Sequence, residues 1–93
     1  MHATTSTLDP AARAALQARL KSIEGQARGI GRMLDEGRDC HEVLDQLAAL
    51  RAAAHAAGMQ ALEAFALQCL RETPGAPEQV MSEFLGSVSK LTR

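Results

Sequence analysis

The 93-residue sequence predicts an all-α fold of three helices, and three observations support this fold class. Alanine and leucine, which favour helices, make up almost a third of the chain, whereas valine, isoleucine and aromatic residues, which favour strands, are scarce. Apolar residues recur at intervals of three and four positions. Glycine and proline end this pattern near residues 37 and 74, so we expect helices at about 9–36, 39–72 and 77–92.

The first predicted helix begins where Asp9 can cap its first turn and Pro10 is preorganised for the first helical position. It ends before Gly37, because glycine is typical of helix C-termini. Its apolar stripe consists of Leu16, Leu20, Ile23, Ala27, Ile30 and Leu34. Residues 1–8 are predicted to be a disordered segment, and residues 9–93 a single domain.

The second predicted helix begins at another capping residue, Asp39, and continues without proline to about Arg71. At about 1.5 Å per residue it is about 50 Å long, far longer than a monomer of this size needs, so we expect it to pack against other copies. Pro77 begins the third helix. The apolar side of this last helix consists of Val80, Met81, Phe84, Leu85, Val88 and Leu91.

Composition and charge exclude several classes of protein. The net charge of −1, from 10 basic and 11 acidic residues, does not by itself predict a nucleic-acid partner. No apolar run is long enough to span a membrane, and the N-terminus lacks the basic and apolar regions of a signal peptide, so we expect a cytoplasmic protein. No nucleophile–base pair or phosphate-binding loop is visible, so we do not expect an enzyme.

The two cysteines, Cys40 and Cys69, lie about eight full turns apart on the second predicted helix, so both thiols face the same side. They are about 43 Å apart along the axis, whereas a disulfide requires Cα atoms within about 7 Å. They could meet only if the helix packs antiparallel against its twin, with a two-fold axis near Ala54 and His55. Alternatively, each cysteine is a small buried apolar residue.

The surroundings of the cysteines favour thiol chemistry. Cys40 lies at a helix N-terminus, where the helix dipole favours the reactive thiolate, and Arg38 could add positive charge. Two thiolates could also hold Cu(I), although one turn before Cys69 stands Phe65, which cannot bind a metal. The histidines are expected to be surface or interface residues rather than ligands: His2, His41 and His55.

A basic stripe lies opposite the apolar stripe of the first predicted helix, and its members fall within about 100° of one another: Arg13, Lys21, Arg28 and Arg32. In a monomer such a stripe is usually a solvated outer face. In a symmetric oligomer its copies could form a phosphate-binding surface. The stripe alone leaves both interpretations open.

Several segments together form a specific pattern: RLKSIEGQ at residues 19–26, Gly29-Ile30, Met33, EGRDC at residues 36–40, and QLAA at residues 46–49. This pattern resembles the CsoR/RcnR family of bacterial transcriptional repressors, and the resemblance extends over nearly the whole chain from about residue 8. It implies three helices per subunit, an antiparallel four-helix-bundle homodimer and a disc-shaped homotetramer. It also implies binding to operator DNA without a helix-turn-helix.

Given the DNA-binding function that the resemblance implies, we expect basic side chains to contact DNA phosphates. The candidates are Arg19, Lys21 and Arg51, together with the stripe residues Arg13, Arg28 and Arg32. Ala56 departs from the family's copper sensors, which carry an arginine there that is implicated in DNA contact. Arg51 can serve in its place, because the persulfide-sensing branch has a basic residue at that position.

The same resemblance identifies the residues that would bind an inducer. Cys40 matches a nearly universal sensor cysteine, and Cys69 matches the second cysteine of copper sensors and of CstR-like persulfide sensors. Phe65 stands where metal and formaldehyde sensors have a histidine, and Leu8 where nickel and cobalt sensors have an N-terminal histidine. Two thiols without these histidines resemble the persulfide sensors.

We therefore predict a repressor of sulfide-detoxification genes that responds to persulfide or polysulfide and uses no cofactor. Cys40 would attack the inducer, Cys69 of the partner subunit would resolve the product, and Phe65 would keep the pocket dry. The alternative is a Cu(I)-responsive repressor with Cys40 and Cys69 as ligands. A helical thiol-transfer or interaction module without a DNA role is a further alternative, and only the family resemblance argues against it.

Overall fold

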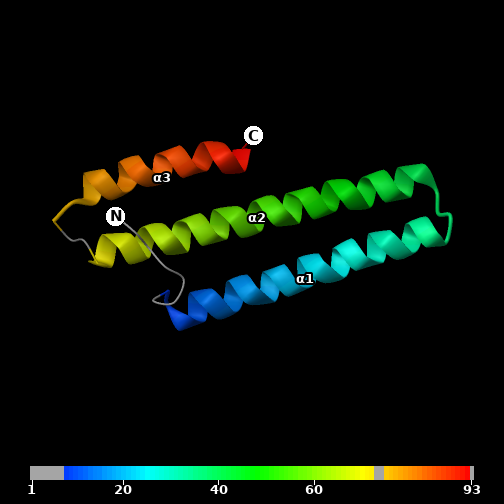
Figure 1. The fold of residues 1–93 in the computed structure, drawn as a ribbon, viewed down its shortest axis with the longest axis horizontal. Coiled ribbons are helices and arrows are strands. Elements are labelled where there is room, and N and C mark those ends of the chain that lie inside the picture. The colour runs from blue at the N-terminus through cyan, green and yellow to red at the C-terminus, as the bar shows by residue number, and fades with distance from the viewer. Residues whose placement is uncertain (1–7, 73–74, 93) are drawn as a thin grey trace.

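The computed structural model describes residues 8–72 and 75–92, which form three helices and no strand. The helices are α1 (Pro10–Asp35), α2 (Cys40–Glu72) and α3 (Pro77–Thr92) (Figure 1). The all-α prediction is confirmed, and each helix end lies within one residue of its predicted position. Over the described ranges, no helix combines the length and the apolar character that a bilayer span requires.

Side-chain caps begin α1 and α2, as the sequence predicts. The Asp9 carboxylate accepts a hydrogen bond from the amide of Ala12 at 3.1 Å, and Pro10 is the first residue of α1. The Asp39 carboxylate accepts one from the amide of His41 at 3.0 Å, directly before α2. Each cap satisfies a backbone donor that has no partner within the first helical turn.

A glycine-containing turn reverses the chain between α1 and α2. Gly37 has a φ of +66°, a left-handed conformation that side chains with a Cβ rarely adopt. Its amide donates to the carbonyl of Leu34 at 3.2 Å, and the amide of Arg38 donates to that of Met33 at 3.0 Å. These two bonds form a Schellman motif, which ends α1 and lets α2 return alongside it (Figure 1).

The three helices form a single flat layer. In Figure 1 the long helix α2 lies in the middle, with α1 along one side and α3 along the other. The molecule measures 57 × 26 × 14 Å, and its radius of gyration is 16.9 Å. A compact domain of this length has a radius of gyration of about 12 Å. One layer of helices cannot enclose a core, because both of its faces remain uncovered.

Few side chains are well buried, and the three most buried of them lie at one end of the layer. The most buried are Leu8, Cys69 and Val80, at the start of α1, the end of α2 and the start of α3. The prediction that residues 1–8 form a disordered segment is therefore wrong for Leu8, which is only 3% exposed; residues 1–7 lie outside the described part. Its apolar side chain is removed from water only by tertiary packing, which helix signals do not report.

Many large apolar side chains remain exposed on the subunit: Leu20, Leu34, Leu44, Leu47, Met59, Leu67, Met81 and Leu85. They come from all three helices. On α3 the predicted apolar side divides: Val80 is buried, whereas Met81 and Leu85 remain more than half exposed. Exposed apolar surface of this extent is typical of a chain that is covered by another subunit.

Residue Leu91 fixes the last turn of α3 against the middle of α2. A Cβ placed on Gly58 would lie 2.6 Å from a methyl group of Leu91, so a larger residue at position 58 would force the Leu91 side chain to move. The ring Nδ1 of His55 lies 3.0 Å from the Leu91 carbonyl and donates a hydrogen bond to it. His55 thus satisfies a carbonyl at the helix C-terminus, where no intrahelical donor is available.

Candidate functional site

Cys40 is the first residue of α2 and is exposed to solvent. The Asp39 cap immediately before it fixes the direction in which the helix begins. The neighbouring His41 is also exposed, as the sequence predicts. Cys40 is therefore accessible to an inducer or to a second subunit.

Arg38, which was expected to add positive charge beside Cys40, has other partners. It forms ion pairs with Glu42 at 2.7 Å and with Glu36 at 3.5 Å. The hydrogen bond and the charge of Glu42 raise the pKa of Arg38 above its ordinary value, so the guanidinium stays protonated. The two carboxylates offset its charge, and the expected contribution of Arg38 to the Cys40 thiolate is not supported.

Cys69 has the opposite environment. Its side chain is 2% exposed near the end of α2. Burial raises the pKa of the Cys69 thiol above its ordinary value, and the negative charges of Glu72 and Glu83 raise it further. At neutral pH Cys69 is consequently a neutral thiol, and it must lose a proton before it can bind a metal or attack sulfur.

The two cysteines do not form one site within a subunit. They stand at opposite ends of α2, about 43 Å apart from the helical rise (Figure 1). Over residues 8–72 and 75–92, no three metal-binding side chains of the His, Cys, Asp or Glu type come together. Phe65 lies one turn before Cys69 and is half-buried. A site that uses both thiols must therefore be completed by a second subunit.

The histidines stand apart from Cys69, as expected. His55 is engaged with Leu91 on α3, and His41 lies at the far end of α2 from Cys69. His2 falls outside the described residues. Leu8 is buried at the same end of the layer as Cys69, so an apolar side chain occupies the region where the resemblance places a histidine in nickel and cobalt sensors.

The structure does not bring all the expected DNA-contacting residues onto one surface. Lys21 and Arg32 are exposed on α1 and Arg51 is exposed on α2, and none of the three has an ion-pair partner among the described residues. Arg28 pairs with Glu24 at 2.6 Å, which offsets its charge. Arg13 is half-buried rather than fully exposed. Among the described residues, the stripe members that are both exposed and without an ion-pair partner are therefore Lys21 and Arg32.

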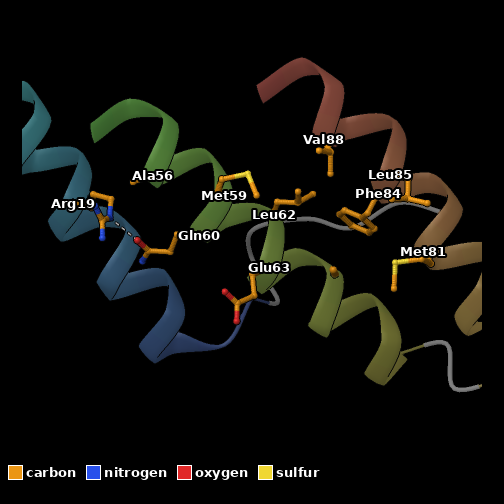
Figure 2. A pocket seen from close by; sticks show the side chains of 11 residues that line it. Arg19, Ala56, Met59, Gln60, Leu62, Glu63, Met81, Phe84, Leu85 and Val88 are labelled. Carbon is orange, nitrogen blue, oxygen red and sulfur yellow. Dashed lines mark hydrogen bonds between the residues drawn. The ribbon is translucent and has the colours of Figure 1, made fainter. Parts of the chain in front are cut away.

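Arg19 lies on a different side of α1 from Lys21, beside α2. Its Nε donates a hydrogen bond to Oε1 of Gln60 at 2.7 Å, as Figure 2 shows. The sequence did not single out Gln60, because no local signal relates two residues on different helices. Arg19 also borders an apolar groove between α2 and α3, whose other lining residues are Ala56, Met59, Gln60, Leu62, Glu63, Ala66, Met81, Phe84, Leu85 and Val88 (Figure 2).

Comparison with known proteins shows the family. The model of the metal-sensitive transcriptional repressor family matches residues 12–90. The copper-sensing transcriptional repressor CsoR of Bacillus subtilis is 39% identical over 77 residues, which cover 81% of this chain and 76% of the relative. The copper-sensing transcriptional repressor RicR of Mycobacterium tuberculosis is 31% identical over 80 residues, covering 81% of this chain and 82% of the relative.

A solved structure shows the same fold. The crystal structure of the copper-sensing repressor CsoR with Cu(I) from Geobacillus thermodenitrificans superimposes with a TM-score of 0.73 at 30% sequence identity, covering 100% of this chain and 94% of that chain. The helical architecture described above is thus shared along the full length. The chain belongs to the family of metal-sensitive transcriptional repressors, and its role is regulatory rather than catalytic.

Proposed function

We propose that this chain represses transcription as an oligomer bound to operator DNA and is released by Cu(I), held by Cys40 of one subunit and Cys69 of the partner subunit. The observation that supports this most directly is the placement of one thiol at each end of α2 in a family whose similar members are copper-sensing. An antiparallel pair of α2 helices would bring the two thiols together twice in each dimer.

The shape of the subunit supports the assembly. A layer only 14 Å thick leaves large apolar side chains exposed on all three helices, and a second layer would remove them from water. An antiparallel dimer forms such a two-layered bundle. Further exposed side chains on α3, Met81 and Leu85, remain for the contact that pairs dimers into a tetramer.

The donor set fits Cu(I). Thiolate sulfur is a soft ligand and suits Cu(I), and two such ligands suffice for a two-coordinate ion. Phe65 offers no third ligand one turn before Cys69, and its ring adds apolar surface beside the site. Because Cys69 is protonated in the unliganded subunit, binding of the metal must release its proton.

Phe65 also favours a second candidate inducer, a persulfide or polysulfide. Loss of the imidazole weakens a metal site but leaves sulfur transfer intact. The Cys40 thiolate would take the outer sulfur of a persulfide and release the donor as a thiol. The partner's Cys69 would then attack the Cys40 sulfur, which forms a disulfide and releases hydrogen sulfide. If Cys69 carries an extra sulfur first, the same attack by its outer sulfur forms a trisulfide.

Either inducer would join the start of one α2 to the end of its twin. This link would change how the two helices pack at both ends of the dimer. The basic side chains on α1 and α2 that contact DNA would then change their relative positions. Coupling between the two sites of about 1–3 kcal/mol is typical of such regulators. Persulfide induction would imply control of genes for sulfide detoxification, and Cu(I) induction would imply control of copper handling.

One anaerobic experiment distinguishes the two inducers. A duplex selected by the purified protein from a random library serves as the operator, and release from it is followed while Cu(I) or sodium polysulfide is added. Cu(I)-induced release at one ion per subunit, without covalent dimers in intact-mass spectra, supports the copper sensor. Covalent dimers formed only by polysulfide, together with release, support the persulfide sensor.

Three variants give the controls for this experiment. Cys40→Ala should bind DNA and ignore either inducer. Cys69→Ala should do the same with Cu(I), but should accept a sulfur on Cys40 without forming a covalent dimer. His41→Ala, which removes the imidazole next to Cys40, should respond like the wild type. Failure of the wild-type protein to select any duplex would refute the repressor function itself.

A further inference from the structure

One hydrogen bond joins a predicted DNA-contacting arginine to the helix that carries both cysteines. Arg19 Nε on α1 donates to Oε1 of Gln60 on α2 at 2.7 Å (Figure 2). Gln60 is half-buried whereas Arg19 is exposed, so the bond ties a guanidinium at the surface to a side chain that is partly packed. Arg19 also borders the apolar groove.

The chemistry of this contact leaves the cation available. A guanidinium has five N–H donors in one plane, and the bond to Gln60 uses the single donor on Nε. The four donors on the terminal nitrogens suit the oxygens of a phosphate. Gln60 is neutral, and no carboxylate pairs with Arg19 among the described residues, so its full positive charge remains. Arg28, in contrast, is paired with Glu24.

We infer that Gln60 is a positioning residue, which holds the Arg19 guanidinium in the orientation that meets a DNA phosphate. This inference rests on the proposed DNA-binding function. Because Gln60 belongs to α2, it also links the helix that binds the inducer to a DNA contact on α1. A shift of α2 against α1 when the two thiols are joined moves Gln60 away from Arg19, so the guanidinium loses its fixed orientation and DNA affinity falls.

A double-mutant cycle on the selected duplex tests this role. Arg19→Ala should weaken binding, and it should lower the slope of log K against log[salt] by about 0.9 for each phosphate that Arg19 neutralises. Gln60→Ala keeps the charge, so we expect binding weaker by about fivefold to tenfold with an almost unchanged salt slope. If Gln60 acts through Arg19, Gln60→Ala should cause no further reduction in the Arg19→Ala background.

Two charge variants sharpen the test. Gln60→Glu places a carboxylate against Arg19, so it should reduce the salt slope as Arg19→Ala does. Gln79→Glu adds the same charge at an exposed position on α3 and should have little effect. Circular dichroism and light scattering check that each variant keeps its helices and its oligomeric state.

The other possible outcomes would each contradict a different step of the inference. Additive effects in the double variant would mean that Gln60 supports the fold rather than Arg19. An Arg19→Ala protein that binds the duplex as tightly as the wild type would remove Arg19 from the DNA surface, and the role of Gln60 with it, while the repressor function itself would stand. Absence of binding by the wild type would instead refute the proposed function.

Discussion

The reciprocal site predicts how mixed dimers respond to oxidation. In one subunit the two cysteines lie about 43 Å apart along α2, about six times the distance of about 7 Å over which Cα atoms can be bridged. In an antiparallel dimer, Cys40 of one subunit meets the partner's Cys69, whereas the two copies of Cys40 remain at opposite ends. Neither Cys40→Ala nor Cys69→Ala should therefore form covalent dimers alone. A mixture of the two should form them, with a single bridge per dimer.

The assay is mild oxidation followed by non-reducing denaturing electrophoresis and intact mass. The two variants carry different affinity tags and are mixed, unfolded and refolded together so that subunits exchange. Wild-type protein should give dimers with two bridges, and the mixture should give dimers that carry both tags. If Cys69→Ala alone formed covalent dimers as readily as the mixture does, α2 would pack parallel to its twin and the reasoning would be refuted.

The remaining predictions concern packing, assembly and pH. Gly58→Ala should destabilise the protein by up to about 2 kcal/mol. Overpacking against Leu91 costs about 1–3 kcal/mol, and the higher helix propensity of alanine offsets about 1 kcal/mol of this cost. Gly86→Ala, whose Cβ meets nothing, should instead stabilise it, and thermal melts at one protomer concentration compare the two. Leu85→Asp should reduce the mass measured by light scattering, whereas Gln79→Asp on another side of α3 should not; equal masses would mean that Leu85 lies outside the interfaces. Cu(I) affinity should rise with pH by up to about tenfold per unit below the raised pKa of Cys69, because binding releases its proton; a flat profile would mean that Cys69 is not a ligand.

The helix boundaries could be predicted because their signals are local. Asp9 with Pro10, the glycine at residue 37 and Asp39 each act within one turn of the chain, and the structure uses each of them as expected. The separation of the cysteines also follows from a single uninterrupted helix. The pairing of Arg38 with Glu42 was available in principle from their spacing of four residues, and it offsets the charge that was expected to act on Cys40.

Features that depend on two helices could not be predicted. The burial of Leu8 depends on tertiary packing, and the bond from Arg19 to Gln60 joins residues 41 positions apart. The division of the apolar side of α3 has the same origin, because the packed structure buries Val80 and leaves Leu85 exposed. Helical periodicity reports which side of a helix is apolar, but not what covers it.

The length of α2 has a genetic consequence. Each α2 supplies Cys40 to one inducer site and Cys69 to the other, so in the proposed dimer no site belongs to one subunit alone. A subunit that lacks both cysteines but keeps its DNA surface would inactivate both sites of every dimer it joins. Such an allele, expressed beside the normal gene, should be dominant and keep the regulated genes silent even when inducer is abundant.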